Sequence, residues 1–252
     1  MKNRIIIANW KLNKTIEETS QFFDEFLPLV EKSKQNIIIC PAYLSLYTAV
    51  TKTLNSKVSI GAQNMHHTPK GVITGEVSPL QLLEIGVKHS IIGHSSRRTE
   101  LNETNEDINK KIISAIEHKI SPILCVGETR KEKEAGRTYR VLKKQLITAF
   151  DGVETADGII VAYEPLWAIS DGKTPAKTPE TEEVSKTISG IKRVVKQIFG
   201  AEEAKKIKYL YGGSVTPNDA KGFMSIKSVS GVLVGGASLS PQKFADIVKS
   251  VE

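Results

Sequence analysis

Short apolar runs alternate along the whole chain with longer amphipathic segments. Eight runs of four to seven residues are rich in Ile and Val, which is typical of strands buried on both faces of a sheet. The runs are IIIAN from residue 5, IIIC from 37, VSIGAQN from 58, SIIGH from 90, ILCVGE from 123, IIVAYE from 159, IKYLYGG from 207 and GVLVGG from 231. Between them the apolar residues have helical spacing, as in residues 16–32 and 105–119. The pattern predicts strand and helix in alternation, eight times over.

Several predicted helices carry start signals. Thr15 and Glu18 have the spacing of a capping box, in which each side chain accepts a hydrogen bond from the other residue's backbone N–H. Four further pairs place a cap residue before a proline at the first helical position. They are Ser78-Pro79, Thr178-Pro179, Thr216-Pro217 and Ser240-Pro241.

The spacing of the predicted strands favours one closed barrel. Their starts lie about 32 residues apart on average, the size of a strand, a helix and their connections. No Ser/Gly-rich linker divides the chain, so residues 1–252 are predicted to form a single α/β domain. Eight parallel strands in about 250 residues fit a (β/α)8 barrel better than an open doubly wound sheet, which usually has fewer strands.

The composition is that of an ordinary globular protein. With 40% hydrophobic and 25% charged residues, the chain has no apolar stretch near the ~18 residues of a membrane span. The N-terminal sequence MKNRIIIANWKLNK lacks the apolar core of a signal peptide. We therefore expect no export, no membrane association and a cytoplasmic location.

The net charge of +7 raises the question of a nucleic-acid partner. Most Lys and Arg residues lie in amphipathic segments that also contain acids, such as KEKEAGRTYRVLKKQL at 131–146. Few aromatic residues are present to stack on bases. We interpret the basic residues as solvated helix faces and expect no nucleic-acid binding. A basic surface still attracts a small anionic substrate by diffusion.

Neither the cysteines nor the histidines predict a disulfide framework, a metal site or a cofactor. Cys40 and Cys125 are the only cysteines, and we interpret them as buried thiols of a reducing compartment. In an extended chain the adjacent His66 and His67 would point their rings in opposite directions, and no Cys or carboxylate lies at ligand spacing. We expect neither a metal ion nor a cofactor.

Two predicted connections, residues 64–78 and 165–178, are longer than simple turns. Loops of roughly 12 to 15 residues are usually functional or disordered. The first contains Met65, Val72 and Ile73 among polar residues, which predicts an interaction surface. The second begins with proline and tryptophan, and we interpret it as a lid over a site.

Polar residues and glycines follow most of the predicted strands. In a (β/α)8 barrel the carboxyl ends of the strands carry the active site, so these residues are candidates for chemistry. In chain order they are Asn9, Lys11, His94, Ser95, Ser96, Arg97, Arg98, Cys125, Glu128, Glu164, Gly212, Gly213, Ser214, Gly235 and Gly236.

Each candidate taken alone has a structural alternative. Lys11 can be a surface lysine, His94 can be a histidine that only ends a strand, and Glu164 can simply accept backbone N–H groups. Together they place a base, an imidazole and a cation at one barrel mouth, beside glycine-lined backbone donors suited to phosphate. This combination predicts proton abstraction next to the carbonyl of a phosphorylated substrate.

Sequence motifs at these strand ends resemble those of the triosephosphate isomerase family. They are ANWKLN at 8–13, GAQN at 61–64, TGEVSP at 74–79, IIGHSSRR at 91–98, CVGET at 125–129, AYEPLWAI at 162–169, YGGSV at 211–215 and GVLVGGASL at 231–239. The match covers nearly the whole chain. The resemblance implies a TIM barrel and cofactor-free interconversion of dihydroxyacetone phosphate and D-glyceraldehyde 3-phosphate through an enediolate, a step of glycolysis and gluconeogenesis.

The resemblance also implies roles for individual residues. Glu164 would be the base that moves a proton between two carbons, and neutral His94 would polarise the carbonyl; the family is a standard example of this pairing. Lys11 with Asn9 would stabilise the enediolate and anchor the substrate. The phosphate would lie on the backbone N–H groups of Ser170, Ser214, Gly235 and Gly236. The family is typically a homodimer, which implies that the loop at 64–78 lies beside a partner's active site.

The chain departs from the family pattern at two segments. The family usually has a glutamate where this chain has Ser96, so a carboxylate is missing near Lys11 and we expect slower turnover in an intact site. The family's lid usually reads Gly-Thr-Gly-Lys. In this chain residues 170–173 read Ser-Asp-Gly-Lys and are followed by about two additional residues.

Four residues are expected to support the site without binding substrate, namely Ser96, Arg97, Arg98 and Glu128. For Glu128 we favour an ion pair with Arg97 or Arg98. The main alternative function is a catalytically impaired relative that binds phosphorylated ligands or serves as a structural dimer. A different sugar-phosphate isomerase is disfavoured, because the base, the imidazole and the cation are all retained.

Overall fold

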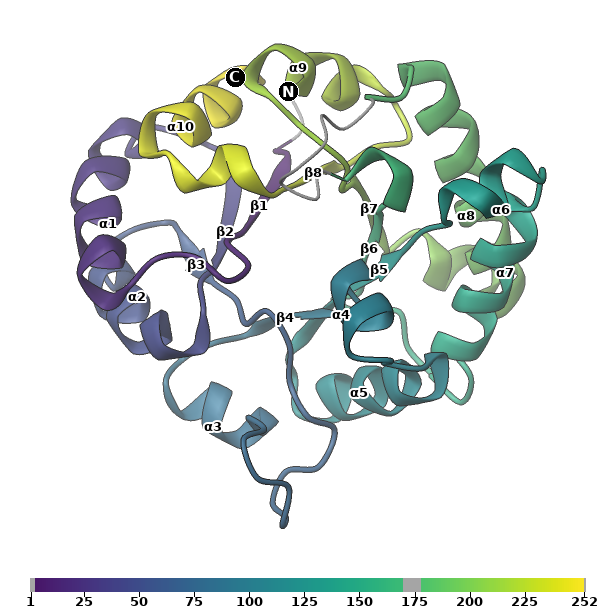
Figure 1. The fold of residues 1–252 in the computed structure, drawn as a ribbon, viewed down its shortest axis with the longest axis horizontal. Coiled ribbons are helices and arrows are strands. Elements are labelled where there is room, and N and C mark those ends of the chain that lie inside the picture. Colours follow the sequence, from purple (N-terminus) through teal and green to yellow (C-terminus); the bar gives the residue numbers. More distant parts are fainter. Residues whose placement is uncertain (1–2, 170–177, 252) are drawn as a thin grey trace.

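The computed structural model describes residues 3–169 and 178–251. In these residues eight parallel strands form a central sheet with helices around its outside (Figure 1). The strands are β1 (Ile5–Asn9), β2 (Asn36–Cys40), β3 (Ser59–Ile60), β4 (His89–Ile92), β5 (Ser121–Val126), β6 (Ile160–Tyr163), β7 (Lys208–Tyr211) and β8 (Gly231–Val234). Each strand overlaps one of the apolar runs, so the strand predictions are confirmed.

The sheet closes into a barrel between β3 and β4. The hydrogen-bonded order is β3-β2-β1-β8-β7-β6-β5-β4, which leaves these two strands at the ends. Ala62, just after β3, bridges them: its N–H donates to the carbonyl of His89 (2.8 Å), and its carbonyl accepts from the N–H of Ile91 (2.9 Å). The predicted (β/α)8 barrel is therefore confirmed.

Helices cover the outside of the barrel. They are α1 (Ile16–Val30), α2 (Leu46–Thr53), α3 (Pro79–Glu84), α4 (Ser95–Glu100), α5 (Asn105–Glu117), α6 (Arg130–Glu134), α7 (Thr138–Ala149), α8 (Thr181–Ala204), α9 (Pro217–Ser225) and α10 (Pro241–Lys249). Within residues 3–169 and 178–251, no helix combines the length and the hydropathy that crossing a membrane requires.

Most of the predicted helix starts are confirmed. The capping box is present at the start of α1, and proline occupies the first position of α3, α9 and α10. The prediction for Pro179 is wrong, because α8 begins at Thr181. Glu180 has an extended backbone with ψ of 145°, so the chain turns into the helix only after this residue.

Side chains from alternate strand positions fill the interior of the barrel. This inner cluster consists of Ile7, Ile38, Cys40, Ile91, Ile123, Cys125, Ile160, Ala162, Leu210 and Leu233. Burial raises the pKa of both thiols, and neither cysteine is in a disulfide. Because the thiolate is the reactive form, these cysteines behave as core residues, as the sequence predicted.

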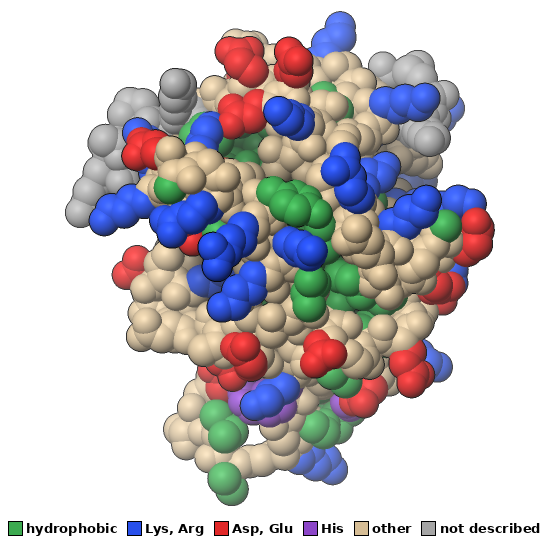
Figure 2. Space-filling view, turned by 90° about the vertical axis from the view of Figure 1, so that its right-hand side faces the viewer, with side chains coloured by type: hydrophobic (Ala, Val, Ile, Leu, Met, Phe, Trp, Pro, Cys, Tyr) green, Lys and Arg blue, Asp and Glu red, His purple; other side chains and the backbone are tan. Residues whose placement is uncertain are grey.

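The side of the barrel covered by α6 and α7 is strongly basic. Residues 130–149 contain seven Lys or Arg residues and two Glu residues. Figure 2 looks onto this side and shows basic side chains gathered around a strip of apolar ones. Among the described residues, Lys133 is the one basic residue of this stretch in an ion pair, with Glu183 at 2.5 Å. The interleaved acids therefore neutralise little of this face, and it attracts anions.

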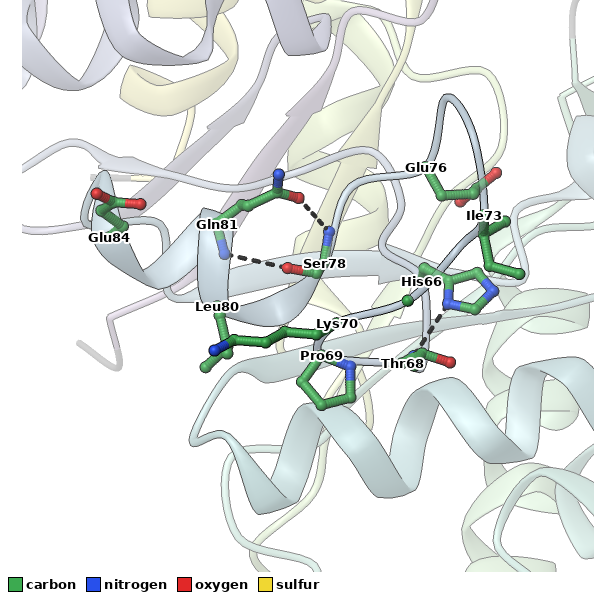
Figure 3. Close-up of a pocket in the computed structure, with 11 residues that line it drawn as sticks. His66, Thr68, Pro69, Lys70, Ile73, Glu76, Ser78, Leu80, Gln81 and Glu84 are labelled. Carbon is green, nitrogen blue, oxygen red and sulfur yellow. Dashed lines mark hydrogen bonds between the residues drawn. The ribbon is translucent and has the colours of Figure 1, made fainter.

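The loop at residues 64–78 projects from the barrel, at the bottom of Figure 1. Val72 and Ile73 are 98% and 52% exposed, as expected for an interaction surface. Including Met65 in that surface is wrong, because its side chain is fully buried in the core. A cavity of about 520 Å³ lies between the loop and α3 (Figure 3).

The rings of His66 and His67 stack, with their centroids 4.3 Å apart. The prediction that they point in opposite directions is therefore wrong. Both residues lie in the irregular loop after β3, where the alternation of a strand does not apply. His66 Nδ1 accepts a hydrogen bond from the N–H of Thr68 (3.0 Å; Figure 3). Among the described residues no group of three potential metal ligands is found.

Candidate active site

A cavity of about 170 Å³ lies at the carboxyl ends of the strands. Its described walls come from the ends of β1, β4 and β6 and from the segments after β7 and β8. They include the predicted site residues Asn9, Lys11, His94, Glu164, Gly212, Gly213, Ser214, Gly235 and Gly236. Parallel strands end on the same rim of a barrel, which is why residues so distant in sequence meet here. Ser170 lies outside the described residues.

Glu164 follows β6 and is almost completely buried, with 2% of its surface exposed. Its Oε1 lies 3.6 Å from Nε2 of His94, which is too long for a hydrogen bond. Among the described residues its Oε2 has no hydrogen-bond partner. The carboxylate therefore retains acceptor capacity toward a molecule in the cavity.

His94 follows β4 and caps the N-terminus of α4, and its side chain is also buried. Its Nδ1 accepts a hydrogen bond from the backbone N–H of Ser96 (3.2 Å). Because an amide N–H can only donate, this bond assigns the unprotonated state to Nδ1 and the proton of the neutral ring to Nε2. The N–H donor of the ring is thus on the side of Glu164.

Lys11 follows β1 with a backbone φ of 53°, in the left-handed region that non-glycine residues seldom adopt. Two hydrogen bonds hold it there. Its N–H donates to Oδ1 of Asn9 (3.1 Å), and its carbonyl accepts from Nε2 of Gln63 (2.8 Å). A Cβ placed on Gly235 would lie 3.8 Å from Cε of Lys11, so the ammonium group lies over the glycine segment after β8.

The glycine segments after β7 and β8 line the cavity with backbone atoms. Nothing lies within 4 Å of a Cβ built on Gly236, the first residue of the short helix Gly236–Leu239. The N–H of Ser214 is already used, because it donates to the carbonyl of Ala168 (2.9 Å). Of the predicted phosphate donors, Ser214 is therefore not free in this conformation.

Comparisons with known proteins agree with this geometry. A family model described as triosephosphate isomerase matches residues 4–251. The chain belongs to the triosephosphate isomerase family. Curated relatives named triosephosphate isomerase are 41% identical in Clostridium beijerinckii and 45% identical in Aquifex aeolicus, each covering 98% of this chain and 99% of the relative. A crystal structure of triosephosphate isomerase from Bartonella henselae superposes with a TM-score of 0.89 at 32% identity, covering 99% of both chains.

Within this triosephosphate isomerase fold, Glu128 does not pair with an arginine as predicted. Its Oε1 accepts hydrogen bonds from the hydroxyl of Tyr163 (3.1 Å) and from Nε1 of Trp167 (2.9 Å). Burial and the neighbouring Glu128 raise the pKa of Tyr163, which keeps its hydroxyl protonated and able to donate. The prediction is wrong because both arginines are used elsewhere. Glu128 instead ties the start of the 165–178 connection to the end of β5.

The two arginines of the IIGHSSRR motif bind structural partners. Arg98 donates to the carbonyls of Gly93 (2.7 Å) and Cys125 (3.0 Å), and so joins the ends of β4 and β5. Burial lowers the pKa of its guanidinium. Arg97 donates through Nε to Oε2 of Glu103 (2.9 Å). Neither residue is among those that line the cavity.

Three polar side chains that contact site residues were missed by sequence reasoning. Gln63 supports the backbone of Lys11, while Tyr163 and Trp167 bind Glu128. All three lie inside motifs that resemble the family, GAQN and AYEPLWAI. The motifs were therefore an available signal, but they do not state which side chain each residue contacts.

Proposed function

We propose that this chain interconverts dihydroxyacetone phosphate and D-glyceraldehyde 3-phosphate by cofactor-free proton transfer through an enediolate, in glycolysis and gluconeogenesis. The observation that carries the proposal is the buried pair of Glu164 Oε1 and His94 Nε2, separated by 3.6 Å at the barrel mouth. At this separation the carboxylate can contact a carbon-bound proton while the N–H group donates a hydrogen bond to the neighbouring carbonyl oxygen.

Each group has a defined part in the proposed reaction. Glu164 takes a proton from the carbon next to the carbonyl and returns it to the adjacent carbon. His94 donates its Nε2–H to the carbonyl oxygen, where negative charge develops, and regains a proton from the neighbouring hydroxyl, whose oxygen becomes the new carbonyl oxygen. Lys11 supplies a fixed positive charge to the enediolate, and Asn9 holds the backbone of Lys11. Burial strengthens these interactions, because water screens charges only weakly inside the site.

The phosphate of the substrate would lie on the segments after β7 and β8. We assign its binding to the backbone N–H groups of Gly235 and Gly236, whose lack of side chains allows close approach. Ser214 would join them once its bond to Ala168 opens. The basic face on α6 and α7 would raise the encounter rate with this dianion.

A coupled assay of the purified protein tests the function. We expect the coupling enzyme to reduce the dihydroxyacetone phosphate that this protein forms from D-glyceraldehyde 3-phosphate. The activity should be retained after dialysis against EDTA, since the proposed reaction uses no metal. A wild type no more active than Glu164→Asp would instead support the impaired relative that only binds phosphorylated ligands. Inorganic phosphate should inhibit competitively, since the proposed site holds the phosphate group.

Gly212→Ala is expected to lower kcat by roughly ten- to a hundredfold. A Cβ on Gly212 would lie 2.7 Å from Cγ of Glu164, so the base must move, and a shift of about 1 Å can cost on the order of a hundredfold in rate. The control is Gly222→Ala, where the added Cβ meets nothing closer than 3.6 Å. An unchanged kcat in Gly212→Ala would show that the position of the base is not critical.

We also propose that the chain is a cytoplasmic homodimer assembled through the loop at 64–78. The support is the exposure of Val72 and Ile73 at the tip of a projecting loop. Ile73→Asp should raise the dimer dissociation constant by on the order of a hundredfold, because it places an unpaired charge in the interface. Sedimentation velocity over a concentration series measures this. Leu54→Asp, at a 72% exposed position at the end of α2 and outside the loop, serves as the control and should leave the dimer intact.

A further inference from the structure

The hydroxyl of Ser96 lies against the imidazole of His94. Its Oγ is 2.8 Å from Nδ1, closer than the backbone N–H of the same residue, whose nitrogen is 3.2 Å away. Nδ1 thus has two neighbouring donor groups, both from Ser96. The 2.8 Å contact is in the normal range of a strong hydrogen bond, whereas 3.2 Å is at its long end.

The direction of the hydroxyl bond follows from the amide. An N–H group cannot accept a hydrogen bond, so Nδ1 must carry a lone pair toward Ser96. The Ser96 hydroxyl therefore has no proton to accept from the ring and can only donate. Both bonds favour the same tautomer, in which the ring proton is on Nε2 and faces Glu164.

We infer that Ser96 is a positioning residue that acts through the His94 ring, a role that rests on the proposed isomerase function. Its hydroxyl holds the imidazole in the Nε2–H tautomer and in one orientation. By withdrawing electron density from Nδ1 it also makes Nε2–H a stronger donor to the substrate oxygen, since linked hydrogen bonds polarise one another. Ser96 itself is exposed, on the first turn of α4, and does not need to contact the substrate.

The tautomer is measured directly by nuclear magnetic resonance on protein labelled with ¹⁵N at its five histidines. The His94 signals are assigned by their loss in His94→Gln. In the wild type we expect an unprotonated Nδ1 shifted by hydrogen bonding. In Ser96→Ala that resonance should move downfield toward the value of a free imine-type nitrogen, and in Ser96→Thr it should stay in place. An unmoved resonance in Ser96→Ala would overturn the proposal.

Kinetics supply the second readout. Ser96→Ala should lower kcat by about three- to tenfold, the usual worth of one hydrogen bond, with KM changed less than about twofold. Ser96→Thr should restore most of kcat. Thr99→Ala removes a hydroxyl from the same helix and should have no such effect. Among the described residues this hydroxyl bonds the carbonyl of Ser95 and the side chain of Glu100. Equal kcat in wild type and Ser96→Ala would count against the proposal.

Ser96→Glu separates this role from the expectation that a missing carboxylate slows the enzyme. An ionised carboxylate has no hydrogen to donate to Nδ1, so kcat should fall as it does in Ser96→Ala. A kcat above that of the wild type would contradict the positioning role. If the wild type proves inactive, the isomerase proposal fails by itself, and the resonance of Nδ1 still decides whether the hydroxyl holds the ring.

Discussion

Glu164→Asp is expected to lower kcat by on the order of a hundredfold, with a much smaller change in KM. The substitution keeps the charge but removes one methylene, which withdraws the carboxylate by about 1 Å from the substrate carbon. The residue is 2% exposed, so no bulk water is available to relay the proton in its place. The coupled assay measures kcat and KM separately for wild type and variant.

Glu164→Gln should be more severe still, because it keeps the shape of the side chain and removes the base. General base catalysis is worth about 10² to 10⁴ in rate, and a loss in this range is expected. The matched control for Glu164→Asp is Glu117→Asp, which removes one methylene from an exposed glutamate of α5. This control variant should behave as wild type. A Glu164→Gln variant with the wild-type kcat would rule Glu164 out as the base.

Glu103→Ala is expected to lower the free energy of unfolding by about 3–5 kcal/mol. Glu103 forms a buried ion pair with Lys111 and accepts a hydrogen bond from Arg97 at 2.9 Å. Without this carboxylate, the ammonium of Lys111 remains buried with Oδ1 of Asn64 at 2.8 Å as its described partner. An uncompensated buried charge of this kind is far more costly than a lost surface pair. Urea unfolding followed by circular dichroism measures the change.

Two further variants separate the charge from the cavity that the truncation leaves. Glu103→Ala combined with Lys111→Met should recover part of the lost stability, because the unpaired ammonium is removed. Glu202→Ala breaks an exposed pair with Lys205 and should change stability little. If Glu103→Ala unfolds at the same urea concentration as wild type, the buried pair does not stabilise the fold.

The alternation of apolar runs and amphipathic segments was enough to predict the barrel. Strands buried on both faces and joined by helices must form a parallel sheet, and parallel strands bring all their carboxyl ends to one rim. The sequence alone therefore places Lys11, His94 and Glu164 at one rim. The motifs around them were enough to predict the family. These conclusions depend on residue type and order along the chain, which the sequence states directly.

Only the tertiary structure decided which partner each polar side chain binds. Glu128 binds Tyr163 and Trp167 because β5 pairs with β6 in a register that sets Val126 beside Tyr163. The sequence could not exclude an arginine as its partner, since either pairing would satisfy the carboxylate.

In the loops and in the site, too, the sequence could not decide which side chains are buried or which atoms they contact. Met65 is buried while Val72 and Ile73 are exposed, although all three are apolar residues of one segment. The contact between the hydroxyl of Ser96 and the ring of His94 depends on the first turn of α4. Hydrogen bonds and burial are decided by differences of about 1 Å in packing and register. The sequence alone determined the fold, the family and the set of reactive groups, whereas packing decided how those groups are held.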